Sequence, residues 1–143
     1  MLLAIFYFFF PHVWGELLYP LDYKDSIKKY SEERGLRPNF VCAIIYTESR
    51  FNPKSVSSVG ALGLMQVMPG TGDSIAQEIG EKTGDLTDPD TSIKYGTWYI
   101  KGLVDKYKDG VMALPNETTF FVQKVKSAEA MYDKVYDAWY SQS

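Results

Sequence analysis

The sequence predicts an all-α protein. Three observations support this class: apolar residues recur at intervals of three and four, glycine or proline separates the apolar stretches, and no convincing pair of strands can be found. The chain has 143 residues, which corresponds to one domain of ordinary size. Its 45% hydrophobic content suffices for a core without cross-links, and the single cysteine, Cys42, excludes an internal disulfide.

The first eighteen residues form an apolar leader. Met1 to Phe10 is almost wholly apolar, and further apolar residues follow as far as Leu18. A spanning helix needs about 20 apolar residues, whereas the hydrophobic region of a signal peptide needs about 7–15. We therefore expect residues 1–18 to act as a signal or signal-anchor that exports the protein or attaches it to a membrane. A hydrophobic N-terminal helix packed on the domain is the alternative.

Five helices are predicted in the domain that follows, residues 19–140. Apolar residues at helical spacing indicate a first helix that ends at Gly35. A second helix begins near Pro38, which suits a first helical turn, and runs to about Ser49. Residues 54–66 are rich in serine and glycine, which favours a short loop or β-ribbon.

The second half of the domain completes the helical pattern. A short helix follows Pro69 and closes near Gly80. Ser92 can cap a fourth helix that runs to Tyr107, and Asn116 can cap the last one. The predicted architecture is thus a small helical domain with one irregular segment near its middle.

Charge and composition exclude several classes of function. The 15 basic and 18 acidic residues give a net charge of −3 without a basic run, which disfavours a nucleic-acid partner. The only histidine, His12, lies in the leader, which disfavours a multi-histidine metal site and a Ser-His-Asp triad. Any chemistry must therefore rest on carboxylates, hydroxyls and amides.

Glu48 is the most informative residue. It follows Val41 by seven positions and Ile44 by four, so it projects from the apolar stripe at the C-terminal end of the second helix. Burial and the negative end of a helix both disfavour the charged form, and both raise the pKa of a carboxyl group. A general acid near neutral pH needs such a pKa. Alternatively, the carboxylate reaches solvent or pairs with Arg50.

The segment GALGLMQVMP at residues 60–69 joins glycines to an apolar run that contains one amide. Gly63 permits close backbone approach to a ligand or a helix. Met65 offers an adaptable apolar surface, and Gln66 offers both a donor and an acceptor. The alternative is a tightly packed connector in which Gln66 satisfies backbone groups of the loop.

Together with TESRFNP at residues 47–53, this segment resembles the soluble lytic transglycosylase (SLT) family, whose fold is similar to goose-type lysozyme. The resemblance covers roughly residues 19–137. It implies cleavage of the MurNAc–GlcNAc bond of bacterial peptidoglycan with formation of a 1,6-anhydro-MurNAc end. It also implies a location in the bacterial cell envelope, either exported, membrane-anchored or extracellular. We expect a monomer whose partners are peptidoglycan glycan strands.

The resemblance also assigns roles to residues. It implies that Glu48 acts first as the catalytic acid and then as the base. The residues implied to bind the substrate are Ser49, Gly63, Leu64, Met65 and Gln66. Glu48 would protonate the glycosidic oxygen, the substrate's 2-acetamido group would stabilise C1, and Glu48 would then accept the proton of the C6 hydroxyl as it attacks C1. No metal or cofactor is implied.

Two departures from the family pattern leave a second function open. The usual Ala-Tyr-Asn-Ala-Gly motif is absent between Tyr107 and Pro115, and Phe121 stands where the family usually has tyrosine. Glu48 and the Gly-Leu-Met-Gln motif favour an enzyme. The alternative is a degenerate SLT domain that binds glycan strands or an envelope complex without cleavage. A lysozyme that uses water is a third possibility.

Overall fold

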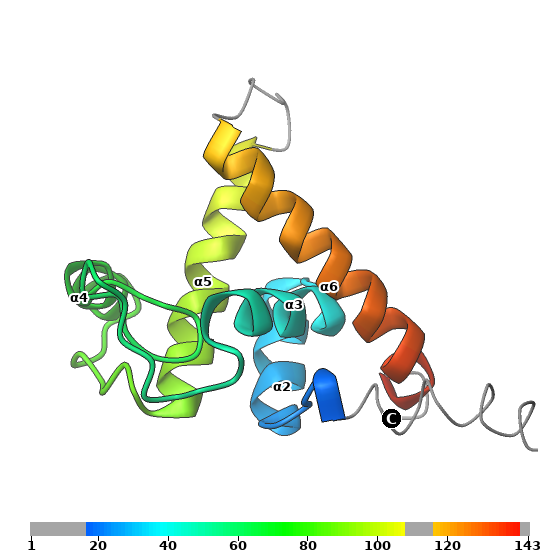
Figure 1. Cartoon of the computed structure of the whole chain (residues 1–143). Helices are drawn as coiled ribbons and strands as arrows, with labels where there is room; N and C mark the ends of the chain where they lie inside the picture. The colour runs from blue at the N-terminus through cyan, green and yellow to red at the C-terminus, as the bar shows by residue number, and fades with distance from the viewer. Residues whose placement is uncertain (1–16, 108–115, 141–143) are drawn as a thin grey trace, which may run out of the picture.

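The computed structural model describes residues 17–107 and 116–140 of the chain (Figure 1). These residues contain five helices: α2 (Lys24–Arg34), α3 (Pro38–Ser49), α4 (Pro69–Glu78), α5 (Pro89–Tyr107) and α6 (Asn116–Tyr140). The all-α prediction is confirmed. Most of the predicted leader lies outside the described residues. Among the helices that are described, none combines the length and the apolar character needed to cross a membrane.

Helix α3 forms the centre of the fold. It packs against α6 and α2, and in Figure 1 it lies between them. Residues 41–45 are all buried, including Cys42, as expected for a small apolar side chain. A helix that is apolar on every side is stable only when neighbouring elements cover it. Glu48 follows this buried stretch on the same helix, so the core itself positions the carboxyl group.

The ends of α2 and α3 agree with the sequence signals. Asn116, which was expected to cap the last helix, is instead the first residue of α6. Gly35 adopts a left-handed conformation (φ 64°) and ends α2, and Pro38 occupies the first turn of α3. The prediction that Ser92 caps α5 is wrong, because the helix begins at Pro89. The carboxylate of Asp88 accepts a hydrogen bond from the backbone N–H of Thr91 (2.9 Å), so Asp88 is the cap. Ser92 lies inside the helix and is fully buried.

The segment between α3 and α4 is held by isolated bridges. Leu62 pairs in antiparallel fashion with Val56 on one side and with Val67 on the other. These pairings agree with the predicted loop or short ribbon over residues 54–66. They fold the segment back on itself, so that residues 63–67 return to the end of α3.

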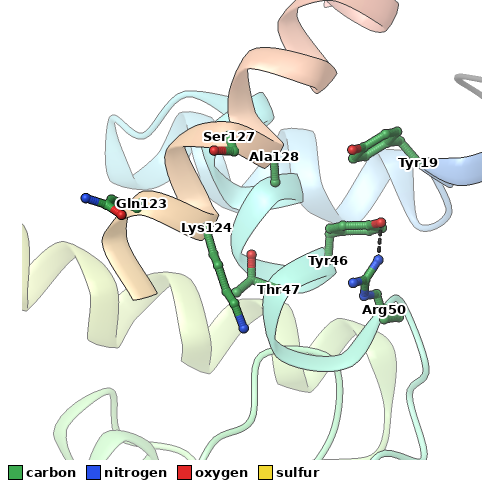
Figure 2. Close-up of a pocket in the computed structure, with 8 residues that line it drawn as sticks. All are labelled: Tyr19, Tyr46, Thr47, Arg50, Gln123, Lys124, Ser127 and Ala128. Carbon is green, nitrogen blue, oxygen red and sulfur yellow. Dashed lines mark hydrogen bonds between the residues drawn. The ribbon is translucent and has the colours of Figure 1, made fainter. Parts of the chain in front are cut away.

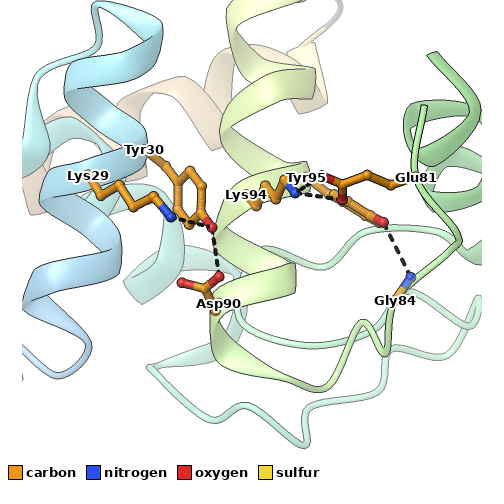
Figure 3. Close-up of polar contacts among 7 residues, drawn as sticks. All are labelled: Lys29, Tyr30, Glu81, Gly84, Asp90, Lys94 and Tyr95. Atoms are coloured by element: carbon orange, nitrogen blue, oxygen red, sulfur yellow. Dashed lines mark hydrogen bonds and ion pairs between the residues drawn. The ribbon is translucent and has the colours of Figure 1, made fainter. Parts of the chain in front are cut away.

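The first turn of α5 is attached to α2 by hydrogen bonds (Figure 3). In Figure 3 the hydroxyl group of Tyr30 donates a hydrogen bond to Asp90 (2.6 Å). The hydroxyl group of Ser26 donates another to the same carboxylate (2.7 Å). Lys94 forms an ion pair with Glu81, which precedes α5. These contacts orient α5 so that its next turns face the returning loop. The pKa of Tyr30 is raised because the phenol is buried and hydrogen-bonded to Asp90.

Candidate active site

A cavity of about 230 Å³ lies between α3, α5 and the loop that returns before α4. Glu48 enters it from α3, Met65 and Gln66 enter it from the loop, and Tyr99 lines it from α5. The other lining residues are Ile44, Val67, Met68, Thr71, Gly96 and Ile100. Three of the six residues predicted to form a site, Glu48, Met65 and Gln66, are thus brought together.

The Glu48 carboxyl group has the electrostatic environment of a general acid. Burial raises its pKa above the ordinary value of a glutamate. Within the described ranges, no group donates a hydrogen bond to the Glu48 carboxyl group, and no cation forms an ion pair with it. Arg50, the alternative partner, instead lies over the ring of Tyr46 at 4.1 Å from the centroid. Glu48 therefore stays protonated to a higher pH than an exposed glutamate.

Gln66 supports the loop and lines the cavity at the same time. Its Nε2 donates hydrogen bonds to the carbonyl oxygens of Gly63 (2.9 Å) and Ser55 (3.2 Å). Because both acceptors are carbonyl oxygens, the amide nitrogen must face them. The amide oxygen has no hydrogen bond within the described residues. It is the acceptor that this side chain can offer to a ligand.

Two buried serine hydroxyls hold the peptide group between Leu64 and Met65. Ser49 Oγ donates a hydrogen bond to the carbonyl oxygen of Leu64 (2.8 Å). The backbone N–H of Met65 donates one to Ser92 Oγ (3.2 Å). We call these two hydroxyls the serine clamp. Ser49 and Leu64 do not line the cavity, and both contribute to the site by holding the loop between α3 and α5.

Gly63 also lies outside the cavity, and its small size serves packing. A Cβ atom at this position would lie 2.0 Å from the carbonyl oxygen of Leu86 and 2.9 Å from Ser92 Oγ. The backbone is left-handed there (φ 77°), which a side chain would also strain. Gly63 therefore permits the loop to approach the start of α5 as closely as the serine clamp requires.

Sequence reasoning missed Gly96, which lines the cavity from α5. A Cβ atom on Gly96 would lie 2.4 Å from Met65 Sδ, so the missing side chain makes room for Met65. The available signal was a glycine inside a helical pattern, because such a glycine often marks a position where another part of the chain packs closely against the helix. Ser92 was also missed as a member of the site, because a serine near a helix start was interpreted as a cap.

Phe121 lies in a separate apolar cavity of about 190 Å³ between α3, α5 and α6. Ile44 and Ile100 line both this cavity and the one that contains Glu48. The two cavities therefore share a wall. The residue that replaces the usual tyrosine contributes an apolar surface beside the Glu48 cavity. Side chains of the preceding turns of α6 lie outside the described residues.

The arrangement offers one carboxyl group for proton transfer. Glu48 can donate a proton to a leaving group and then accept one as a carboxylate. The neighbouring surface is mostly apolar, and Gln66 and Tyr99 also line the cavity. Within residues 17–107 and 116–140, no three His, Cys, Asp or Glu side chains gather as metal ligands.

Comparisons with known proteins agree with the fold and with the resemblance to the SLT family. The family model "Transglycosylase SLT domain" matches residues 25–132. The soluble lytic murein transglycosylase of Escherichia coli K12 is 37% identical over 101 residues, which cover 66% of this chain and 16% of that protein. The membrane-bound lytic murein transglycosylase C of Serratia proteamaculans is 37% identical over 94 residues, which cover 62% of this chain and 26% of that protein.

A solved structure shows the same fold. An inactive mutant of the lytic transglycosylase Slt from Pseudomonas aeruginosa superposes with a TM-score of 0.73 at 24% sequence identity. The match covers 83% of this chain and 25% of that one. The chain therefore spans about a quarter or less of these relatives' own lengths.

Proposed function

The chain belongs to the transglycosylase SLT family, and from this membership we propose that it is a peptidoglycan lytic transglycosylase. One observation carries the proposal: Glu48, in the family's motif, presents a carboxyl group of raised pKa to a cavity that Met65 and Gln66 also line. The raised pKa favours the protonated form that the first step requires. We further propose that the protein acts in the bacterial cell envelope, with residues 1–18 as its signal or anchor.

Glu48 performs both proton transfers in this mechanism. Its carboxyl proton passes to the oxygen of the MurNAc–GlcNAc bond as the C1–O bond breaks. The substrate's own 2-acetamido oxygen stabilises the positive charge that develops at C1. The Glu48 carboxylate then takes the proton of the C6 hydroxyl, and O6 bonds to C1 to give the 1,6-anhydro product. Glu48 is thereby returned to its protonated form.

The neighbouring residues bind the substrate and hold the acid in place. The free amide oxygen of Gln66 accepts a hydrogen bond from a sugar hydroxyl or acetamido N–H. Met65 and Tyr99 provide apolar surface for a sugar ring. Ser49, Gly63 and Leu64, which the resemblance implies as binding residues, serve in this proposal by fixing the loop.

Digestion of isolated peptidoglycan by the purified full chain tests the proposal, with the products identified by mass spectrometry. We expect fragments with 1,6-anhydro-MurNAc ends. Glu48→Gln keeps the shape of the side chain and removes its acidic proton, so the rate should fall by at least about a hundredfold. Glu78→Gln, at an exposed position in α4, is the matched control and should cleave at the normal rate.

Other products would identify other functions. Reducing ends would indicate a hydrolase that uses water. Sedimentation of the chain with peptidoglycan without any release of fragments would indicate the degenerate binding domain. Normal turnover by Glu48→Gln would remove Glu48 from the mechanism.

A further inference from the structure

Helix α3 ends, just after Glu48, in a turn whose backbone conformation is rare. Among the described residues, four that are not glycine have a positive φ: Tyr23, Arg50, Phe51 and Gln66. Arg50 (φ 52°) and Phe51 (φ 61°) are consecutive. Side chains disfavour this left-handed conformation, so it persists only where surrounding contacts hold it. Contacts of both residues must therefore keep the turn closed beside Glu48.

Phe51 is held by the core. Its side chain is buried, and its ring lies near that of Tyr132 in α6, with centroids 6.3 Å apart. The backbone N–H of Asn52 donates a hydrogen bond to the carbonyl oxygen of Ser49 (3.0 Å), which ties the turn to its own helix. Burial of a large apolar side chain offsets the cost of the strained backbone at this position.

Arg50 is exposed, and it is held instead by Tyr46, one helical turn earlier (Figure 2). Its guanidinium group lies over the Tyr46 ring, 4.1 Å from the centroid, and donates a hydrogen bond to the Tyr46 hydroxyl. Its backbone N–H donates to the Tyr46 carbonyl oxygen (3.1 Å). The Tyr46 ring is itself packed against Tyr19 and Tyr132, with centroids 4.9 and 6.2 Å away. We call this pair of residues the Arg50–Tyr46 clasp.

The clasp brackets Glu48 but lies outside its cavity. Tyr46 and Arg50 stand two positions before and two positions after Glu48, and neither lines the cavity. Burial is the cause that raises the pKa of Glu48, so the Arg50 charge does not determine it. Arg50 can act on Glu48 through the backbone, by keeping the last turn of the helix wound. If this turn frayed, the carboxyl group would move from the cavity towards solvent.

The same turn determines where the loop returns to the cavity. The carbonyl oxygen of Ser55 accepts hydrogen bonds from the backbone N–H of Gly63 (2.9 Å) and from Gln66 Nε2 (3.2 Å). Between Arg50 and Ser55 the chain has little slack, because the N–H of Ser55 donates to the carbonyl oxygen of Asn52 (3.2 Å). A shift at Arg50 is therefore passed on to Ser55 and to the Gln66 amide.

We propose that Arg50 is a positioning residue for Glu48: its clasp on Tyr46 keeps the left-handed turn closed, which holds the carboxyl group inside the cavity. This inference rests on the proposed function, in which Glu48 is the acid. Arg50 touches neither the substrate nor the reacting atoms. Its charge grips an aromatic ring, and its effect reaches Glu48 through the conformation of residues 48–51.

Three substitutions of Arg50 separate this role from others. Arg50→Met removes the clasp and leaves a residue that disfavours the left-handed backbone. Arg50→Gly also removes the clasp, but glycine adopts this conformation readily. Arg50→Lys keeps a cation over the ring. We expect kcat on peptidoglycan to fall about tenfold in Arg50→Met with KM nearly unchanged, and most of the loss to be recovered in the other two variants.

The pKa of Glu48 gives a readout that a merely structural role would not change. It is measured by NMR titration of the glutamate-labelled full chain, with Glu48→Gln to assign the signal. A carboxyl group that moves towards solvent loses its burial, so the pKa of Glu48 should fall in Arg50→Met and stay raised in Arg50→Gly. Among the described lining residues, Tyr99 is the only other titratable side chain.

Lys29→Met is the matched control. Lys29 lies over the ring of Tyr30, 4.7 Å from the centroid, and donates a hydrogen bond to its hydroxyl (3.3 Å), as Arg50 does with Tyr46. Its removal breaks the same kind of pair in α2 and should change neither kcat nor the pKa of Glu48. Tyr46→Phe removes only the hydroxyl acceptor of the clasp, so it should give a smaller fall of this pKa in a folded chain.

The clasp would be overturned by an unchanged Glu48 pKa in Arg50→Met, or by equal losses of kcat in Arg50→Met and Lys29→Met. Equal losses in Arg50→Met and Arg50→Gly would also overturn it, because the side chain would then not act by maintaining the backbone conformation. A rise of KM at constant kcat would make Arg50 a substrate contact instead.

Failure of the clasp and failure of the proposed function give different results. If Arg50→Met lowers the pKa of Glu48 but the original chain releases no anhydro fragments, the proposed function is wrong and the clasp stands. If the original chain releases anhydro fragments, and Arg50→Met changes neither kcat nor the pKa of Glu48, the clasp is wrong and the function stands.

Discussion

Glycine at position 96 determines how deep Met65 sits beside Glu48. Adding a Cβ atom at Gly96 would place it 2.4 Å from Met65 Sδ and 2.5 Å from Met65 Cβ. We expect Gly96→Ala to displace Met65, to lower the free energy of unfolding by about 1–3 kcal/mol, and to reduce cleavage of glycan. Denaturant titration and a cleavage assay measure the two effects.

Gly102 provides the matched control in the same helix. A Cβ atom there meets nothing within 4 Å, so Gly102→Ala should gain up to about 1 kcal/mol from helix propensity alone. If both alanine variants are equally stable and active, the space at Gly96 has no role in the site.

Glu48 should make the free energy of unfolding depend on pH, and the sign of this dependence follows from the burial of its carboxyl group. Burial raises its pKa in the folded state above the unfolded value, so the folded protein binds the proton more tightly. Its contribution to stability is present at low pH and is lost as the pH rises through the folded pKa. Glu48→Gln should therefore become more stable relative to the original chain as the pH rises above the ordinary pKa of a glutamate, as denaturant titrations at each pH would show.

The same group should limit catalysis on the alkaline side. The proposed mechanism requires protonated Glu48, so kcat/KM should fall as the pH rises through the pKa of Glu48 in the free enzyme. A profile that stays flat across this range would contradict the assignment of Glu48 as the acid.

At the scale of single residues, the sequence predicts some roles and misses others for physical reasons. The direction of Glu48 follows from helical periodicity, because the position of a side chain around a helix depends only on its spacing. For Gln66 the two predicted alternatives hold together: its Nε2 donates to backbone carbonyl oxygens of the loop, and its side chain also lines the cavity. Gly63 was expected to approach a ligand or a helix, and it packs against the start of α5.

At the scale of elements, the serine clamp joins α3, α5 and the loop between them. Ser92→Ala would leave the buried N–H of Met65 without an acceptor, which costs about 1–3 kcal/mol. We expect a loss of stability of that size and a larger loss of activity, because Met65 and Gln66 would no longer be fixed. Chemical unfolding followed by circular dichroism measures the first effect.

Ser74→Ala is the control for this variant. Its hydroxyl group donates to a carbonyl at the exposed start of α4, so its removal should change stability by less than about 0.5 kcal/mol. Equal losses for Ser74→Ala and Ser92→Ala would mean that the clamp adds nothing beyond an ordinary surface hydrogen bond.

The order and approximate limits of all five helices could be predicted, whereas the contacts that join them could not. Apolar spacing, Gly35 and Pro38 act locally, so the sequence reveals them directly. The clamp joins Ser49 and Ser92 through a loop that is distant from Ser92 in sequence. Such pairings depend on how helices pack, and a single sequence does not show this.

At the scale of the whole molecule, the boundary between leader and domain can be tested. The hydroxyl groups of Tyr132 and Tyr136 donate hydrogen bonds to the carbonyl oxygens of Pro20 (2.8 Å) and Tyr19 (2.9 Å). The chain is thus attached to α6 from residue 19 onward. We expect a variant that lacks residues 1–18 to stay soluble, to keep its helical content and to unfold cooperatively in circular dichroism melts.

Removal of residues 1–22 is the informative comparison. It deletes both hydrogen bonds and the buried side chain of Leu21, so the free energy of unfolding should fall by about 2–4 kcal/mol. Aggregation of the shorter deletion would show instead that the leader forms part of the core. Sedimentation of the same variants would also check the expected monomer.

The serine clamp also determines how the protein loses activity when it is heated. One hydroxyl belongs to the helix that carries Glu48, and the other belongs to a helix across the core. A hydrogen bond needs its heavy atoms within about 3.2 Å of each other and a nearly linear geometry, so the helices cannot part without releasing the loop. The cavity therefore has no independent melting transition of its own. Thermal inactivation and global unfolding should coincide, and a partly unfolded chain with a working site should not accumulate.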